Sequence, residues 1–213
     1  MSHMPISTSK EPIRLFQSDF LEFFTHISPI TVLVVWLPVA LFFLGRAIVQ
    51  TSAGGGLLWV YIVIAFVAGM FLWTFTEYML HRFLFHHHPK TPRQERIFFL
   101  FHGVHHAQPQ SKTRLVMPPL VSIPLALVFY GAFYLILGLL LGASHWIAPL
   151  FSGLIAGYLT YDMIHYSMHH FPMNRGYFRF VKIYHMNHHF KTPDRRFGVS
   201  SPLWDVVFGT KPA

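Results

Sequence analysis

Four long stretches of the chain are almost wholly apolar, and each is long enough to cross a bilayer as a helix. They cover about residues 28–48, 57–80, 118–142 and 145–166. A membrane-spanning helix needs about 20 residues of this kind. Pro118 and Pro119 suit the start of the third stretch, because the missing N–H of proline is not needed in a first helical turn. The pattern predicts an all-α integral membrane protein with four transmembrane helices.

The polar segments between these stretches predict the rest of the architecture. Residues 1–27 form an N-terminal segment, and residues 28–213 form a single membrane domain whose helical cap consists of residues 81–117 and 167–213. Within the first segment, RLFQSDFLEFFTHI (residues 14–27) places its apolar residues on roughly one helical face. This spacing fits an interfacial helix and a packed core helix equally well.

Composition supports membrane insertion and narrows the chemistry. Charged residues make up 11% of the 213 residues, whereas a soluble domain carries about a quarter. Cysteine is absent, which excludes disulfides, thiolate zinc sites and iron–sulfur clusters. Any bound metal must therefore be held by nitrogen or oxygen.

The positive charges indicate an orientation. Of sixteen lysines and arginines, all except Arg46 fall in the segments on one side of the predicted spans. Such an excess is typical of cytoplasmic segments, so we expect both termini and the cap to be cytoplasmic, in a bacterial inner membrane or the endoplasmic reticulum. Topology and contact with anionic lipid headgroups explain the net charge of +8, and no nucleic-acid partner is expected.

Histidine is the unusual residue of this chain. There are sixteen, and fourteen of them follow the second predicted span, mostly in the motifs HRFLFH, HGVHH, IHYSMHH and YHMNHH. All four motifs emerge on the predicted cytoplasmic side. Ten histidines in these motifs are candidate metal ligands: His81, His86, His102, His105, His106, His165, His169, His185, His188 and His189.

Helical spacing predicts how the ten converge. Residues three and four apart share a helix face, so each HxxHH triplet (residues 102–106 and 185–189) is expected to converge on one point. His165 and His169 form an i, i+4 pair. His81 and His86 are five apart, so we expect the helix to end between them, or the two to serve different ions.

Ten imidazoles exceed the four to six ligands that one ion takes, so two ions are predicted. Packed together without metal, they would leave buried polar groups unpaired at about 1–3 kcal/mol each. The remaining histidines are expected to be ordinary core or surface residues, with His170 facing away from its neighbour and two residues beside a proline turn solvated. They are His3, His26, His87, His88, His145 and His170.

The motifs also limit the metal chemistry. A structural zinc site closes with four ligands, a zinc hydrolase of the HExxH type lacks its motif here, and a metal transporter places ligands within its spans. What remains is a redox-capable pair of ions at the membrane surface, suited to oxygen chemistry on a lipid.

The four histidine motifs together resemble the fatty acid hydroxylase family. Two further stretches, TRLVMPP (residues 113–119) and FGVSSPLWDVVFGT (residues 197–210), are similar to the fatty acid 2-hydroxylases within it. The resemblance covers roughly Trp73 to Thr210. It implies that the ten histidines above are metal ligands, and it omits His87, His88 and His170.

The resemblance further implies an O2-dependent oxidoreductase that hydroxylates C2 of a fatty acyl chain, free or in a sphingolipid or ceramide. Two iron ions are the expected cofactors, and zinc is able to occupy their sites in purified protein. Yeast and animal members carry a haem-binding cytochrome b5 domain for which residues 1–25 are too few, so a separate donor of cytochrome b5 or ferredoxin type is expected. Hydroxylation of a carotenoid or sterol, and a non-catalytic zinc-binding membrane protein, are the alternatives.

Two carboxylates are candidates for orienting the ligands. Metal-bound histidines usually donate their second ring N–H to a carboxylate or carbonyl. Asp162 lies three residues before His165, and Glu77 lies four residues before His81. These two acids are therefore candidates for contacting ligand histidines, the alternative being ordinary acids at a helix end, and Asp205 is expected to have a structural role.

Overall fold

The computed structural model describes residues 6, 7, 9, 11–52 and 57–212. The described residues are helical with connecting turns and contain no strand. The chain forms two compact units, and the boundary between them falls within two long helices. Unit 1 comprises Met1–Ser28, Phe75–Val116 and Tyr161–Ala213, and unit 2 comprises Pro29–Thr74 and Met117–Thr160.

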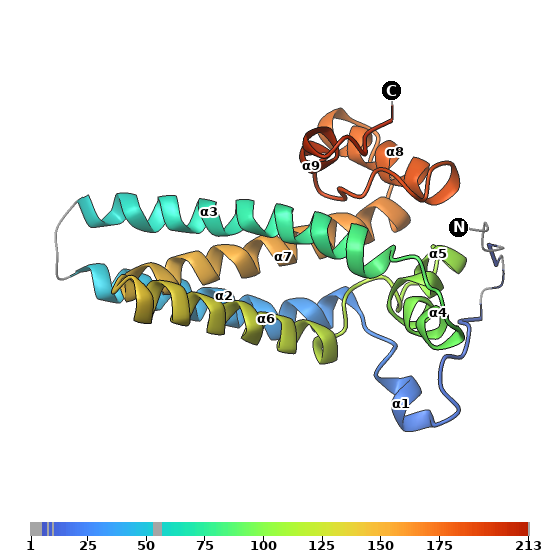
Figure 1. Cartoon of the computed structure of the whole chain (residues 1–213), viewed down its shortest axis with the longest axis horizontal. Helices are drawn as coiled ribbons and strands as arrows, with labels where there is room; N and C mark the ends of the chain where they lie inside the picture. The colour runs from blue at the N-terminus through green and yellow to red at the C-terminus, as the bar shows by residue number, and fades with distance from the viewer. Residues whose placement is uncertain (1–5, 8, 10, 53–56, 213) are drawn as a thin grey trace. The chain divides into compact units, whose positions relative to one another are not determined.

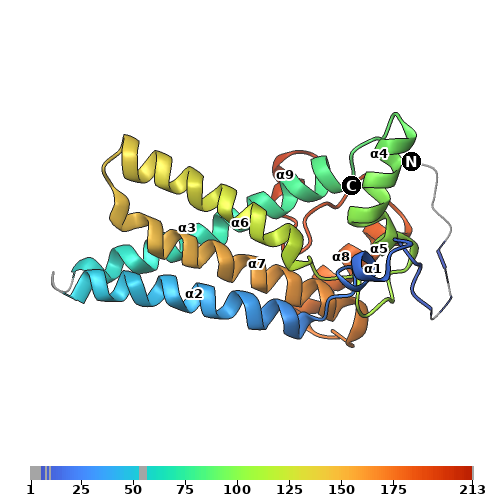
Figure 2. The ribbon, with the colours of Figure 1, turned by 90° about the horizontal axis from the view of Figure 1, so that it is seen from below.

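Unit 2 is built from four long apolar helices that run alongside one another (Figures 1 and 2). Two belong to it alone, α2 (Pro29–Ser52) and α6 (Pro119–Phe133), the latter continued by a π-helical segment, Tyr134–Leu140. The other two, α3 (Leu57–Met79) and α7 (Ile147–His170), contribute their N-terminal parts; a short 3-10 turn, Ser144–Trp146, precedes α7.

Small residues let these helices approach closely. A Cβ atom added to Gly69 of α3 would lie 2.1 Å from the carbonyl oxygen of Leu150, and one added to Gly153 of α7 would lie 2.0 Å from that of Phe66. The two backbones are therefore in direct contact, as in many membrane helix pairs with small residues at the interface. On α7, Ser152 also donates a hydrogen bond of 2.8 Å to the carbonyl of Ala40 in α2.

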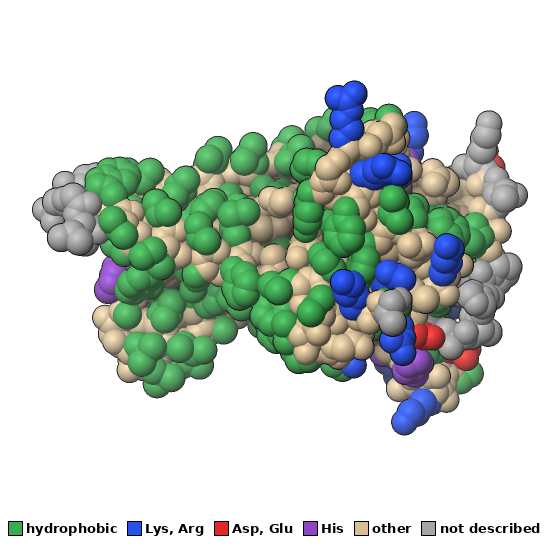
Figure 3. All heavy atoms as spheres, turned by 90° about the horizontal axis from the view of Figure 1, so that it is seen from above, with side chains coloured by type: hydrophobic (Ala, Val, Ile, Leu, Met, Phe, Trp, Pro, Cys, Tyr) green, Lys and Arg blue, Asp and Glu red, His purple; other side chains and the backbone are tan. Residues whose placement is uncertain are grey.

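The surface of unit 2 is that of a protein embedded in lipid. Arg46 is the one charged residue in its sequence, and the face that Figure 3 shows is covered by hydrophobic side chains. Within the described residues, four helical stretches are long and apolar enough to span a membrane: Pro29–Thr51, Trp59–Phe85, Pro119–Leu140 and Ser144–His170. The protein is thus an all-helical, multi-pass membrane protein. The second and fourth stretches continue beyond the predicted apolar runs into the histidine motifs.

Unit 1 contains short helices and the C-terminal ends of α3 and α7. After α3, the chain continues as a π-helical segment and then forms two short α-helices with a second π-helical segment between them. Thr91 caps α4, since its Oγ1 accepts a hydrogen bond from the N–H of Gln94. The elements of unit 1 are α1 (Asp19–Phe23), η1 (Leu80–Phe85), α4 (Pro92–Phe98), η2 (Phe99–Gly103), α5 (Val104–Ala107), α8 (Gly176–Phe190) and α9 (Leu203–Val207).

The N-terminal segment is less helical than its apolar spacing suggests. Only α1, five residues long, forms within residues 14–27. The carboxylate of Glu22 accepts hydrogen bonds from the N–H groups of Leu15 and Phe16, at 2.9 and 2.8 Å. These bonds fold the preceding chain back onto α1, and Ser18 caps the helix where it begins.

The close approach of α3 and α7 predicts different effects for two glycine substitutions. Gly153→Ala should lower the free energy of unfolding by about 1–3 kcal/mol, because the added methyl group meets backbone that cannot move aside. Gly45→Ala in α2 is the matched control, since nothing lies within 4 Å of its Cβ position, and alanine favours a helix by up to about 1 kcal/mol. Unfolding in detergent measures both, and equal stability of the two variants would contradict this packing.

Candidate metal centre

The structure brings the ten candidate histidines together in two groups, all within unit 1. In each group, five ring nitrogens lie within 4.8 Å of one another, and nearly all ten side chains are buried. Group 1 takes its members from η1 and the residue that follows it, from η2, α5 and α8; group 2 takes them from α5, α7 and α8. Group 1 consists of His81, His86, His102, His106 and His188, and group 2 of His105, His165, His169, His185 and His189.

The nitrogen separations fit a metal ion in each group. In group 1, the Nε2 atom of His102 lies 3.1 Å from that of His81 and 3.0 Å from that of His106. In group 2, the Nε2 atom of His185 lies 3.0 Å from those of His169 and His189. Two nitrogens bound about 2.1 Å from one ion are about 3.0 Å apart at right angles and about 3.4 Å apart at the tetrahedral angle. The spacing therefore suits an ion with more than four ligands.

The HxxHH triplets do not converge as their spacing predicts. In the first, His102 and His106 belong to group 1, whereas His105 belongs to group 2. In the second, the outer pair belongs to group 2 and His188 to group 1. Adjacent residues point about 100° apart around a helix, so two neighbouring histidines serve two centres while the i, i+4 pair shares one. The prediction of one convergence point for each triplet is wrong.

The two groups are neighbours because the triplets interleave. The rings of His106 in group 1 and His189 in group 2 stack with their centroids 4.2 Å apart. The two groups therefore lie side by side.

A π-helical turn explains how His81 and His86 meet. The α-helical part of α3 ends at Met79, and the π-helical segment η1 follows to Phe85. The N–H of His86 donates to the carbonyl of His81 at 3.0 Å, an i to i+5 bond that widens the turn. The helix thus ends between the two histidines, as predicted. The alternative, that they serve different ions, is not supported, because both lie in group 1.

Backbone carbonyls orient two members of group 1. The Nδ1–H of His81 donates to the carbonyl of Phe197 at 2.5 Å, and that of His188 donates to the carbonyl of Arg195 at 2.7 Å. With Nδ1 protonated, the Nε2 atom of each ring keeps its lone pair for a metal ion. The spacing of the histidines does not predict this contact between His81 and Phe197, because the two residues are 116 positions apart in the sequence.

The two acids expected to orient ligands differ in what they contact. Glu77 accepts hydrogen bonds from the N–H groups of Val199 and Ser200 and from the hydroxyl of Ser200. It therefore holds the loop that contacts His81. Asp162 is buried in α7, and its role toward His165 stays a prediction.

Burial keeps the imidazoles in the form that binds metal. It lowers the pKa of His106 to about 3. A lowered pKa means that the neutral ring persists to lower pH, so these side chains are uncharged at pH 7, as ligation requires. Burial, reinforced in most cases by neighbouring imidazoles, also holds the pKa well below its usual range at the other members outside the spanning helices: His86, His102, His105, His185, His188 and His189.

The histidines left out of the ligand prediction lie outside both groups. The ring of His170 packs against that of Tyr166, with ring centroids 4.4 Å apart and the planes tilted by 43°. His87 donates to the carbonyl of Leu84, and His88 is exposed. His26 contacts Thr113 and Arg114, His145 packs beside Tyr61, and His3 lies outside the described residues.

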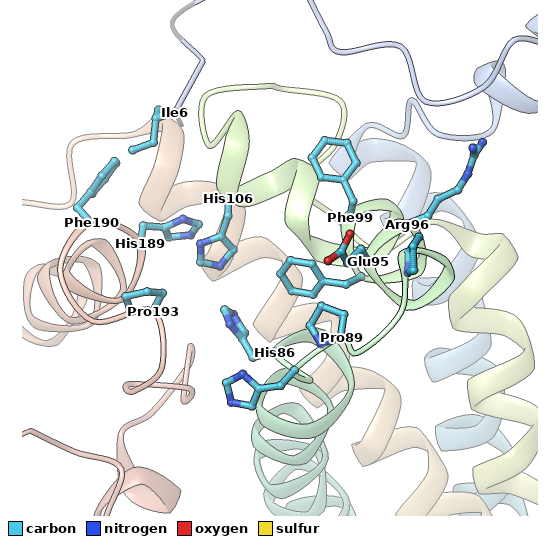
Figure 4. A pocket seen from close by; sticks show the side chains of 13 residues that line it. Ile6, His86, Pro89, Glu95, Arg96, Phe99, His106, His189, Phe190 and Pro193 are labelled. Atoms are coloured by element: carbon cyan, nitrogen blue, oxygen red, sulfur yellow. The ribbon is translucent and has the colours of Figure 1, made fainter. Parts of the chain in front are cut away.

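One cavity reaches both groups. It has a volume of about 760 Å³ and is lined on one side by His86 and His106 of group 1 and His189 of group 2 (Figure 4). Most of its other lining residues are apolar, including Phe98, Phe99 and Phe190, with Glu95 and Arg96 among the polar ones. The fold and the site define a multi-pass membrane protein built around two buried histidine clusters that are able to bind metal ions.

Comparison with known proteins identifies the family. The chain matches the fatty acid hydroxylase family over residues 66–210. It is 40% identical to dihydroceramide fatty acyl 2-hydroxylase FAH1 of Arabidopsis thaliana, over 99% of this chain and 84% of the relative. It is 37% identical to ceramide very long chain fatty acid hydroxylase SCS7 of Saccharomyces cerevisiae, over 98% of this chain and 52% of the relative.

A solved structure of scs7p, in which only the hydroxylase domain is visible, has a TM-score of 0.86 to this chain at 36% identity. The match covers 99% of this chain and 76% of that one. The chain therefore belongs to the fatty acid hydroxylase family, and the resemblance of its motifs is confirmed. Through its homology to fatty acid 2-hydroxylases, it is classed with the oxidoreductases.

His169 belongs to group 2, whereas the adjacent His170 lies outside both groups, and this difference predicts different metal contents for two variants. His169→Ala should lower the bound metal from about two ions per chain to about one, because group 2 loses a ligand nitrogen. His170→Ala should retain both ions, because its ring faces Tyr166. Elemental analysis of purified protein measures the difference, and metal loss from His170→Ala equal to that from His169→Ala would show the ligand set to be wrong.

Proposed function

We propose that this protein hydroxylates C2 of a fatty acyl chain, free or carried in a ceramide or another sphingolipid. The observation that carries the proposal is the meeting of two five-histidine groups beside one largely apolar cavity. The relatives named fatty acid or ceramide 2-hydroxylases support the choice of substrate and position.

The proposed reaction is a balanced monooxygenation. The acyl C–H bond, O2, two electrons and two protons yield the C2 alcohol and one water. One oxygen atom enters the new C–O bond, and the other leaves as water. We propose that a separate donor of cytochrome b5 or ferredoxin type supplies the electrons.

The ten group histidines are the proposed ligands of two iron ions. Imidazole suits iron, and five nitrogens at right-angled spacing exceed the four ligands of a closed zinc site. When bound, iron supplies the activation of O2 that a redox-inert ion does not. Zinc is able to occupy the same nitrogens in purified protein without supplying this chemistry.

Residues of the chain would bind the two ions and exclude water from the site. Buried neutral imidazoles fix both ions without adding charge, and Phe98, Phe99 and Phe190 give the cavity walls that accept hydrocarbon and exclude water. Arg96 provides hydrogen-bond donors for the oxygen atoms at the carboxyl end of the substrate. Because C2 adjoins that end, a polar contact beside the histidines favours oxidation there.

We also propose the orientation predicted from charge, with both termini and the histidine groups cytoplasmic. Residues 28–213 then form one membrane hydroxylase domain, and residues 1–27 an interfacial segment. The first turn of α8 supports this arrangement, because Tyr177, Phe178 and Phe180 are exposed beside Arg175 and Arg179. Exposed aromatic side chains next to basic ones are typical of a membrane interface.

Lipid analysis tests the proposed activity. Expression in a host that lacks 2-hydroxy acids should yield 2-hydroxy acyl lipids, and growth under 18O2 should place one labelled oxygen in each new hydroxyl group. His169→Ala should abolish the product because it removes a proposed ligand. Mass spectrometry of fragment ions locates the label at C2.

Other outcomes would overturn the proposal. A labelled carotenoid or sterol without 2-hydroxy acid would assign a different lipid substrate. No product from iron-loaded protein supplied with a reductant and acyl lipids would favour a non-catalytic metal-binding protein.

A further inference from the structure

The two histidine groups offer the same number of nitrogens, but the surrounding chain holds them differently. In group 1, two rings are tied to backbone carbonyls through Nδ1, those of His81 and His188. In group 2, none of the five Nδ1 atoms has a hydrogen-bond partner among the described residues. The difference comes from one segment, residues 195–210, which contacts group 1.

Within this segment, a loop of four residues is held by two buried carboxylates. Asp205 accepts hydrogen bonds from the N–H groups of Phe197 and Gly198, at 2.9 and 2.8 Å. Glu77 accepts from those of Val199 and Ser200, at 2.6 and 2.7 Å. Both side chains are almost fully buried, and together they accept from all four consecutive N–H groups of residues 197–200.

One peptide unit links Asp205 directly to His81. The N–H of Gly198 and the carbonyl of Phe197 belong to the same peptide group, which is planar and rigid. Asp205 fixes the N–H side, and the carbonyl side accepts the Nδ1–H of His81 at 2.5 Å. Fixing one end of a planar unit fixes the direction of the other.

The same unit transmits charge as well as direction. A carboxylate hydrogen-bonded to a peptide N–H polarises the carbonyl and makes it a stronger acceptor, since hydrogen bonds in a chain reinforce one another. A ring whose Nδ1–H is donated to a strong acceptor is a more basic ligand at Nε2. His81 is therefore both oriented and strengthened by an acid that does not touch it.

We infer that Asp205, assisted by Glu77, is a positioning residue for group 1 and makes this group the tighter of the two metal sites. The inference rests on the proposed binding of one ion by each group. Asp205 acts through the Phe197–Gly198 peptide, and Glu77 keeps the following residues of the loop in place. No Nδ1 atom of group 2 has such a hydrogen-bond partner among the described residues, so this group should release its ion first.

Asp205→Asn tests the role of the carboxylate with little change of shape. An amide has one accepting oxygen, so its NH2 group would face the N–H of Phe197 or that of Gly198, and the loss of either bond would loosen the hold of residue 205 on this loop. Metal content should fall from about two ions per chain to about one. Asp19→Asn, which changes an exposed carboxylate of α1, is the matched control and should keep both ions.

Two double variants show which ion is lost. In protein carrying His169→Ala, the remaining ion lies in group 1, and adding Asp205→Asn should remove it. In protein carrying His188→Ala, the remaining ion lies in group 2, and adding Asp205→Asn should leave it in place. Equal loss in both backgrounds would overturn the inference, because it would mean general destabilisation.

Spectroscopy of the iron-loaded protein gives a readout independent of activity. The wild-type Mössbauer spectrum should contain two components of equal area, and Asp205→Asn should remove or shift one of them. Chelator titration of the wild type should remove the component that Asp205→Asn leaves unchanged. Two ions with an unaltered spectrum in Asp205→Asn would overturn the inference while leaving the proposed function intact, whereas a wild type without bound ions would overturn the proposed function itself.

Thr210→Val provides a milder variant if Asp205→Asn does not fold. The hydroxyl of Thr210 donates to Oδ1 of Asp205 at 2.6 Å, and valine keeps the shape of the side chain without that bond. Its metal loss should be smaller than that of Asp205→Asn and confined to group 1. A chelator titration identical to that of the wild type would contradict the role given to Asp205.

Discussion

Ten imidazole rings, nearly all buried, are directed at two points inside one helical unit and impose the constraint on which the rest of the site depends. Nitrogens 3.0 Å apart, with their lone pairs facing one another, repel unless a proton or a cation lies between them. Burial keeps the rings neutral, with one N–H each, so protons between the rings resolve only part of this conflict. A metal ion satisfies five lone pairs at once. The stability of unit 1 therefore depends on whether its two histidine groups bind metal ions.

This constraint shapes the backbone as well as the side chains. Both π-helical segments of unit 1, Leu80–Phe85 and Phe99–Gly103, contain a member of group 1. A π-helical turn changes the direction of every later side chain by inserting one residue into the helical repeat, and such turns are frequent at functional sites. Likewise, the last two turns of α7 carry His165 and His169, and η1, which continues α3, carries His81, whereas the middles of both helices are apolar. The middle of each helix is apolar because it spans the membrane, whereas its end carries histidine because it contributes to a histidine group.

Much of this organisation follows from local sequence, and the remainder does not. The four spans were predictable because apolar length decides membrane insertion, and the ten histidines because their spacing departs so far from chance. The division of each triplet between two groups was not, because it depends on how α5 and α8 are rotated in the folded unit. The loop at residues 197–200 was also hidden, since Glu77 and Val199 are 122 positions apart. The apolar spacing of residues 14–27 suggests a continuous helix, but only a short helix forms because Glu22 accepts hydrogen bonds from the preceding residues and turns the chain back.

Because α5 contributes ligands to both groups, the spacing of the histidines in its HxxHH motif is fixed. A single helical turn, Val104–Ala107, presents His105 to one group and His106 to the other. Inserting or deleting one residue between His102 and His105 would rotate the pair by about 100° relative to its partner ring and exchange or misdirect the two ligands. The two centres therefore fix the number of residues between the histidines of this motif. Relatives that preserve both centres should therefore differ here by replacement of residues and never by a change in their number.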